Sequence, residues 1–244
     1  MVKMKHASIA AVAPALLLAG LLPATASAKI IEVGATRPSA LVAPTCPPGA
    51  TGSKCTIVLT GVTALETIRD GHTYPTTVTQ PGYIVAFTLG LSALNRNRAT
   101  ALSDLRYLDK TYGTTRARIT VLKPAGTARH RSWVVTAESP TIHLQPYLGE
   151  IVQFPLAVAL PVTRGEVVAL TVPTWAPVLS IGLPTKKFAY RQSRTTGCTT
   201  PSITNQTQSR VGTSAVYGCN YPGTRIEYSA TEITTPPVPR NYLR

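Results

Sequence analysis

Residues 82–91 read GYIVAFTLGL, an apolar run of strand length that predicts a central strand covered on both faces. Residues 165–177, GEVVALTVPTWAP, contain a second run of this kind. The whole chain, these two stretches included, holds 36 Thr, 21 Val and 13 Ile among its 244 residues. Such β-branched side chains are stiff at χ1 and fit a pleated surface better than a helix. The composition therefore favours a β protein over a collagen, a coiled coil or a helical bundle.

Short segments with alternating or fully apolar patterns recur about every ten residues, separated by turn residues and prolines. The segments are 56–62, 82–91, 116–122, 132–137, 141–145, 150–158, 165–172, 178–183, 188–191, 211–217 and 225–233. About ten strands at this spacing predict an all-β fold, a single-domain antiparallel β-sandwich or jelly roll.

One segment departs from the strand pattern. Arg98–Lys110 carries Leu102, Leu105 and Leu108 at every third position, and Gly113 follows soon after. This spacing predicts at most one short helix, near residues 98–110. An extended linker between two strands is the alternative.

The N-terminus has the three parts of a secretory signal peptide. Lys3 and Lys5 give it a basic start, Ala7–Leu22 is apolar, and Ala26 and Ala28 are small residues spaced for signal peptidase. A membrane anchor is the alternative, but it needs roughly 20 apolar residues. We expect cleavage after Ala28 and a secreted protein without a membrane span.

The rest of the chain divides into three parts. Residues 29–45 are expected to be loosely ordered, and residues 46–233 form the β-sandwich domain. Residues 234–244 read TTPPVPRNYLR and predict a Pro-rich tail, because proline cannot donate to a β ladder.

Four cysteines, Cys46, Cys55, Cys198 and Cys219, lie beyond the signal peptide. An even number in an exported chain predicts disulfides, and three pairings are possible. We favour Cys46–Cys55 and Cys198–Cys219, because each pair brackets a loop rich in Gly, Pro and Thr, and each bond should contribute roughly 3 kcal/mol. Zinc is the alternative, but no C-x2-C spacing occurs, and His72, His130 and His143 are isolated.

The chain is strongly basic, with 24 Lys and Arg against 10 Asp and Glu, a formal charge of +14. Its basic residues occur as pairs such as Arg116 and Arg118, which share one face of a predicted strand. An exported protein seldom meets nucleic acid, so the expected partner is an anionic envelope polymer or a glycan. Solubility alone is the other explanation of the charge.

Sequence motifs for catalysis are missing, because no G-x-S-x-G, H-E-x-x-H or S-x-x-K occurs. A glycoside hydrolase needs two facing carboxylates, and Glu138, Glu150 and Glu166 lie near predicted strand ends, with His143 as a further candidate. Ordinary solvated turns explain each of them. We therefore expect neither catalysis nor a metal or other cofactor.

Two aromatic residues are candidate ligand contacts. Trp175 stands between Pro173 and Pro177 and would offer a rigid indole face to a sugar ring. Burial at the end of the sandwich is its alternative role. Tyr147 follows Pro146 and is a candidate exposed tyrosine. Arg116 and Arg118 complete the candidate contacts.

Five segments occur in an order that resembles a group of uncharacterised secreted β-sandwich proteins of high-GC Gram-positive bacteria. The segments are 81–87 (PGYIVAF), 117–122 (ARITVL), 144–149 (LQPYLG), 165–177 (GEVVALTVPTWAP) and 228–231 (YSAT). The resemblance covers 46–233 and implies export, a β-sandwich and two local cysteine pairs. It implies no activity, so it assigns no functional residue.

The sequence thus predicts an exported, cationic, non-catalytic β-sandwich that associates with the cell envelope or an extracellular glycan. A secreted hydrolase acting on wall polysaccharide is the first alternative. A structural protein-interaction module is the second.

Overall fold

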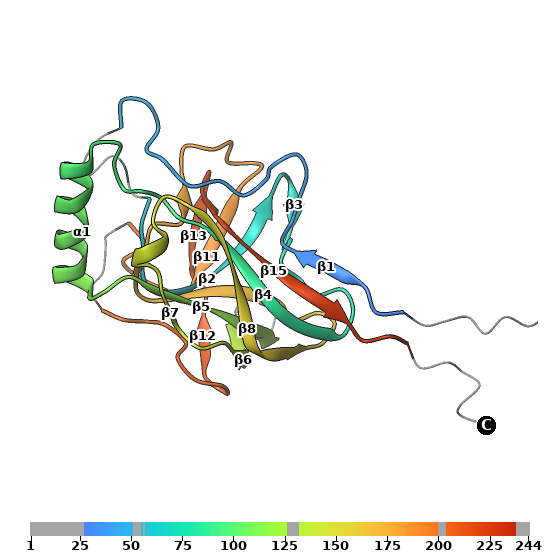
Figure 1. Cartoon of the computed structure of the whole chain (residues 1–244). Helices are drawn as coiled ribbons and strands as arrows, with labels where there is room; N and C mark the ends of the chain where they lie inside the picture. The colour runs from blue at the N-terminus through green and yellow to red at the C-terminus, as the bar shows by residue number, and fades with distance from the viewer. Residues whose placement is uncertain (1–26, 51–54, 56, 126–131, 200–203, 238–244) are drawn as a thin grey trace, which may run out of the picture.

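The computed structural model describes residues 27–50, 55, 57–125, 132–199 and 204–237. These residues form the all-β antiparallel sandwich that the sequence predicts, with one α-helix outside the sheets (Figure 1). Within these ranges, ten strands have four or more residues and five are shorter. Almost all of the predicted signal peptide and most of the C-terminal tail lie outside the described residues.

The smaller sheet has four antiparallel strands in the order β1-β15-β4-β8. They are β1 (Ile30–Val33), β15 (Tyr228–Thr234), β4 (Gly82–Gly90) and β8 (Ile151–Val162). β4 lies between two neighbours, as its apolar run predicts. The segment 29–45, expected to be loosely ordered, contributes the edge strand β1. β1 has only four residues, too few to show an alternating pattern, and its partner β15 lies near the other end of the chain. The sequence therefore did not predict this strand.

The larger sheet follows the order β12-β6-β5-β9-β2-β11-β13. Its strands in that order are Ser214–Val216, Ser132–Glu138, Arg116–Ala125, Val167–Ala176, Leu59–Arg69, Ala189–Gln192 and Cys219–Pro222. Two short strands join it, with β3 (His72–Thr73) on β2 and β7 (Ile142–His143) on β5. A separate pair is formed by β10 (Leu179–Ser180) and β14 (Arg225–Ile226).

Two strands of the larger sheet differ from the sequence prediction. β2 begins at Leu59 and continues to Arg69, beyond the predicted end at residue 62. Its second half contains Glu66 and Arg69, and two charged residues are not expected in a buried strand. In the structure they form a buried ion pair, with Arg69 Nε 2.5 Å from Glu66 Oε2. β13 was not predicted, because its sequence CNYP contains Asn and Pro, which are rare in strands.

β9 shows why the run 165–177 is apolar throughout. Val168, Leu170 and Val172 belong to the main core between the two sheets, together with Ile84 and Phe87 of β4. Val167 and Ala169 point to the other side and belong to a second hydrophobic cluster. The strand is therefore buried on both faces, and neither face needs polar residues.

The second cluster is covered by residues 204–218, called the strap here. The cluster consists of Leu65, Leu122, Trp133, Val135, Val167, Ala169 and Tyr217. The buried Gln208 fastens the strap, because its backbone N–H donates to Thr63 Oγ1 (3.0 Å) and its Nε2 donates to the Trp133 carbonyl (2.9 Å). The Tyr217 hydroxyl donates to Gln208 Oε1.

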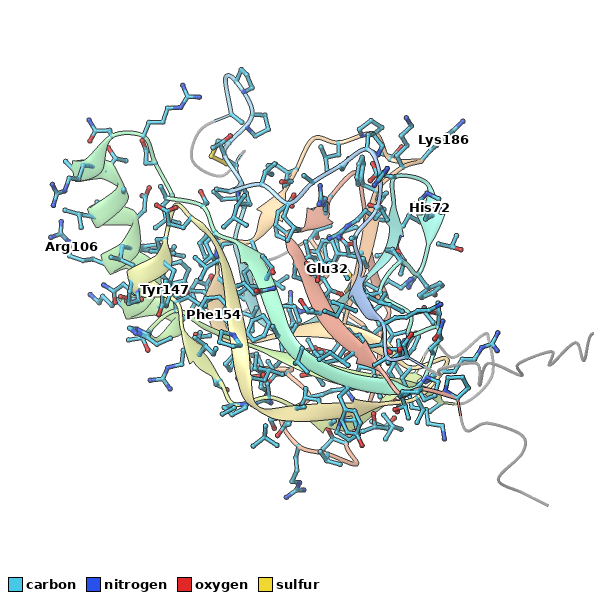
Figure 2. All side chains as sticks on the ribbon, turned by 45° about the vertical axis from the view of Figure 1, so that its right-hand side comes forward. Glu32, His72, Arg106, Tyr147, Phe154 and Lys186 are labelled. Atoms are coloured by element: carbon cyan, nitrogen blue, oxygen red, sulfur yellow. A yellow bond between two sulfur atoms is a disulfide. The ribbon has the colours of Figure 1, made fainter. Side chains whose placement is uncertain are left out.

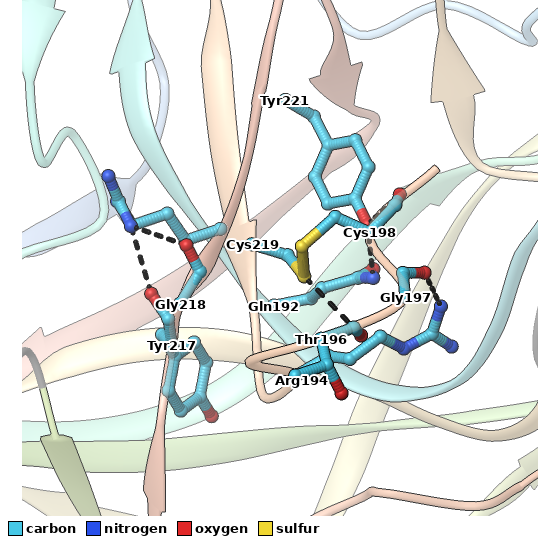
Figure 3. Close-up of a disulfide and its surroundings, with 10 residues drawn as sticks. Gln192, Arg194, Thr196, Gly197, Cys198, Tyr217, Gly218, Cys219 and Tyr221 are labelled. Carbon is cyan, nitrogen blue, oxygen red and sulfur yellow. Dashed lines mark hydrogen bonds between the residues drawn. A yellow bond between two sulfur atoms is a disulfide. The ribbon is translucent and has the colours of Figure 1, made fainter. Parts of the chain in front are cut away.

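Both predicted disulfides are present. Cys46 and Cys55 have their Cα atoms 5.5 Å apart, and Cys198 and Cys219 have theirs 5.3 Å apart. Figure 3 shows the second bond beside Tyr221, whose hydroxyl donates to the Cys198 carbonyl at 2.7 Å. Two disulfides are typical of an oxidising compartment.

Candidate functional site

The predicted helix is confirmed as α1 (Arg98–Tyr112). Asn97 caps its start, because the Asn97 side chain accepts the Thr100 N–H at 3.1 Å. Gly113 ends it at a φ of +87°, and its N–H donates to the Asp109 carbonyl at 2.9 Å. No α1 residue is buried, and Tyr107 is 65% exposed. α1 is therefore a surface element with most of its length open to solvent.

Trp175 joins α1 to the sandwich. Its Nε1 donates to Asp109 Oδ1 at 3.0 Å, and its carbonyl accepts the Thr115 hydroxyl at 2.8 Å. The side chain is fully buried, so the prediction that Trp175 contacts a ligand is wrong. The alternative prediction, burial at the end of the sandwich, agrees with the structure.

Residues 45–50, with Cys46 bonded to Cys55, face α1 across a cavity, and these residues are called the Cys46–Cys55 loop here. Pro47 begins a turn in this loop, where the Ala50 N–H donates to the Pro47 carbonyl at 3.0 Å. The Ile57 carbonyl accepts the Leu179 N–H at 2.9 Å, which attaches the chain beyond Cys55 to β10. The disulfide therefore holds this wall in position against the sandwich.

A cavity of about 820 Å³ lies between α1 and this loop. Its volume is within the range of roughly 300–1,000 Å³ that is usual for small-molecule sites. The apolar part of its lining consists of Pro47, Ala50, Ile57, Val58, Ala93, Leu94 and Leu108. Polar residues of the lining include Asn95, Arg96, Thr100, Asp104 and Tyr107. An apolar lining with a few polar groups is the usual form of a ligand site.

The segment 96–110, whose first residue Arg96 lines the cavity beside Asp104, carries more positive than negative charge. Arg96, Arg98, Arg106 and Lys110 lie within 15 positions of the sequence and are all exposed. Figure 2 shows Arg106 projecting from the side of α1 that faces away from the sandwich. Two acids lie in the same segment, and one of them, Asp109, is bound to the Trp175 indole. The positive end of the α1 macrodipole also lies at this cavity.

The two predicted arginine contacts differ in exposure. Arg118 is held in place, because its Nη2 lies 3.1 Å from Glu138 Oε2 and donates to the Gln208 carbonyl at 3.1 Å. Arg116 is exposed and stands opposite His143 in the β5–β7 pair. Both side chains project from the same face of β5, as predicted, but Arg118 fastens the strap and is not a free cation. Neither arginine lines the cavity.

Tyr147 belongs to a short 3-10 helix, Gln145–Tyr147, and is 38% exposed. Its ring meets the edge of Phe154 with the centroids 5.1 Å apart. Nearby, Gly149 approaches Ala93, which lines the cavity. Tyr147 therefore lies beside one cavity wall without lining the cavity.

The four candidate acid–base residues of the hydrolase alternative do not line the cavity. Glu150 and Glu166 flank opposite ends of the 12-residue strand β8. Glu166 is buried and accepts the Thr163 N–H at 2.6 Å, and Glu138 is paired with Arg118. His143 is exposed on β7. The two facing carboxylates of a glycoside hydrolase are not assembled from these residues.

The side chains and helices of residues 27–50, 55, 57–125, 132–199 and 204–237 bear on two further features, a metal site and a membrane span. Among these residues, no group of three or more His, Cys, Asp or Glu side chains is arranged to hold a metal ion. None of the helices in the same ranges has the length and apolar character needed to cross a bilayer.

Sequence reasoning missed the cavity residues Asp104 and Tyr107. The leucine spacing predicted α1, but not which of its sides faces the loop near Cys46, about 50 positions earlier. The available signal was the pair Arg96 and Arg98 at the start of the predicted helix.

Comparisons with protein-family models, curated proteins and solved structures found no match to this chain.

Proposed function

We propose that this protein is an exported, non-catalytic β-sandwich that binds an anionic extracellular glycan of the cell envelope. The signal peptide would end at Ala28, and the protein would act as a secreted binder. The cavity between α1 and the Cys46–Cys55 loop is the observation that carries this proposal. Its residues supply three groups that an acidic sugar requires.

The chemistry of the cavity matches an acidic sugar. Arg96 offers a planar guanidinium that pairs well with a carboxylate or phosphate group. Asp104 and Asn95 provide acceptors and donors for sugar hydroxyls. The exposed Tyr107 ring offers an apolar face and a hydroxyl at the same position. The apolar lining receives the C–H faces of the ring.

Charge around the cavity sets how binding should depend on salt. The screening length is about 8 Å at 0.15 M salt, so the exposed arginines of α1 steer an anionic polymer and strengthen its binding only over short distances. Binding should therefore weaken as salt rises but retain the contribution of the cavity contacts.

Binding to polygalacturonate, a glycan with a carboxylate on each sugar, tests the proposal, with neutral dextran as the comparison. We expect the secreted protein to bind polygalacturonate and not dextran. Arg96→Gln and Tyr107→Ala should each weaken binding about tenfold, a free-energy change of about 1.4 kcal/mol. Calorimetric titration at low and high salt measures both effects.

Two matched variants control for charge and aromatic content. Lys186→Gln removes an exposed cation at the end of the molecule away from α1 (Figure 2). Tyr83→Ala removes an exposed tyrosine from β4. Both should bind like the wild type. Equal losses in Arg96→Gln and Lys186→Gln, with no loss in Tyr107→Ala, would mean that total charge, and not the cavity, holds the polymer. Hydrolysis of the polymer would favour the hydrolase.

A further inference from the structure

The outer face of the smaller sheet carries a row of exposed apolar side chains that crosses all four strands. The register pairs Ile30 with Ile233, Ile233 with Tyr83, and Tyr83 with Pro161. Directly opposed residues of an antiparallel sheet share a face. Ile30 is 77% exposed, Tyr83 50% and Ile233 38%, and Pro161 is exposed as well. These four residues are called the apolar row.

β8 extends this apolar surface at the edge of the sheet. The β4–β8 register jumps from Ile84↔Leu160 to Ala86↔Pro155, so β8 bulges between these positions. Val158 lies in the bulge and is 71% exposed. An antiparallel sheet with one solvated face normally presents polar residues there. A continuous exposed apolar surface instead indicates contact with a membrane or another molecule.

The structure argues against pairing of an added strand at β8. Pro155 and Pro161 lack an N–H, and the bulge twists the strand edge away from regular geometry. On the β8 side, a contact is therefore left with the face of the sheet. A flat apolar face suits the interfacial region of a bilayer better than a peptide that needs backbone hydrogen bonds.

Charge near the apolar row is positive. Lys29 and Arg164 are exposed at the end of the sheet that carries the row, and neither forms an ion pair within the described ranges. The acidic side chains nearby either accept hydrogen bonds or are buried. Glu32 accepts hydrogen bonds from the hydroxyls of Ser229 and Thr231. Cations beside aliphatic and tyrosine side chains are the combination found in proteins that lie on anionic lipid.

The sequence upstream of β1 places the row near a membrane during export. The apolar run Ala7–Leu22 ends eight positions before Ile30, and eight extended residues span at most about 28 Å. An inserted signal peptide therefore keeps Ile30 within that distance of the bilayer. This step depends on the export proposed above, whereas the exposed row and its cations do not.

We propose that the outer face of the smaller sheet docks on an anionic lipid bilayer, with the apolar row in the interfacial region and with Lys29 and Arg164 at the headgroups. This surface is separate from the cavity at α1. It would hold the exported protein at the membrane while the cavity stays free for a glycan.

Vesicle sedimentation tests the docking face. The secreted protein is mixed with vesicles of equal parts phosphatidylglycerol and phosphatidylcholine, or of phosphatidylcholine alone. We expect binding to the anionic vesicles only. The double variant Tyr83→Ser with Ile233→Ser should lower the bound fraction about fivefold or more, and Lys29→Gln with Arg164→Gln should remove the preference for anionic lipid.

Control variants separate this face from the rest of the molecule. Val211→Ser removes an apolar side chain that is 53% exposed on the strap, and Tyr107→Ala alters the cavity. Both should bind vesicles like the wild type, and tryptophan fluorescence should show that every variant is folded. Unchanged binding of the double serine variant would overturn the proposal. So would a wild-type protein that binds neither vesicle, or a wild-type dimer that the serine variants convert to a monomer.

Discussion

Four charged side chains are buried where β2, β14 and the start of β15 meet. Glu66 pairs with Arg69, and Arg225 Nε lies 3.3 Å from Glu227 Oε2. Arg69 also donates to the carbonyl oxygens of Gly34, Ile226 and Tyr228. Removal of one partner from such a pair typically costs about 3–5 kcal/mol, because it leaves an uncompensated buried charge. These residues therefore contribute to specifying how the N-terminal segment joins the sandwich.

Burial dominates the titration of these acids. It raises the pKa of Glu66 from its ordinary 4.5 to about 7, although Arg69 and Arg225 act in the opposite direction. Burial also raises the pKa of Glu232, which lies on β15 with both carboxylate oxygens lacking a hydrogen-bond partner. An acid whose pKa is raised by folding binds more protons in the native state. Its stabilising effect is complete below the unfolded pKa and declines as pH rises toward the folded pKa.

The first prediction at this scale concerns Glu232. The wild type should lose stability from pH 5 to pH 8, with roughly 3 kcal/mol of the loss due to Glu66. Glu232→Gln should leave the stability at pH 5 unchanged and lose less on the way to pH 8. Urea unfolding at several pH values measures the two slopes. If the variant and the wild type lose equal stability, Glu232 is not a buried neutral acid.

At the scale of elements, the strap and its disulfide stabilise the outer face of the larger sheet. The Cys219 side chain is buried, whereas Cys46 and Cys55 are half-exposed at the cavity. The two bonds therefore have different consequences. The Cys198–Cys219 bond secures the strap over the hydrophobic cluster that contains Trp133, and the Cys46–Cys55 bond secures a cavity wall.

The prediction for these elements uses paired serine variants. Replacement of Cys198 and Cys219 by Ser should lower the free energy of unfolding by about 3 kcal/mol and shift tryptophan fluorescence to the red as Trp133 meets water. Replacement of Cys46 and Cys55 should leave the fluorescence unchanged, since Trp133 and Trp175 stay buried, but weaken polygalacturonate binding. Identical fluorescence in both variants would contradict the separate roles of the two loops.

Local sequence predicts elements well where the pattern is long. The run in β9 is apolar because both faces of that strand are covered, and the leucine spacing and Gly113 locate α1. β4 is central in its sheet, but the prediction that both of its faces are covered is wrong, because Tyr83 is exposed on the outer face. The second half of β2 was missed because the ion pair of Glu66 and Arg69 appears in the sequence only as two charges. β1 forms a strand because it pairs with β15, about 200 residues later in the chain. A local sequence pattern cannot predict so distant a pairing.

At the scale of the whole molecule, two surfaces face different directions. The cavity is lined by residues 45–50, 55, 57–58 and 92–108, and the apolar row lies on the smaller sheet. Figure 1 shows α1 at one side of the molecule, and β1 with the end of β15 at the other side. Composition predicted a cationic binder of envelope polymers, but tertiary contacts decide which cations are free. Arg118 was a predicted contact and is held by Glu138, whereas Arg96 lines the cavity.

Hydrogen exchange of the secreted protein with and without polygalacturonate is the most direct test of the cavity as a glycan site. The account predicts that the glycan slows backbone exchange in residues 92–112 and 45–50, the two walls of the cavity, and that Tyr107→Ala abolishes this protection. It predicts no change in β4, β8 or β15. Protection confined to the smaller sheet, or spread evenly over all exposed cations, would contradict it.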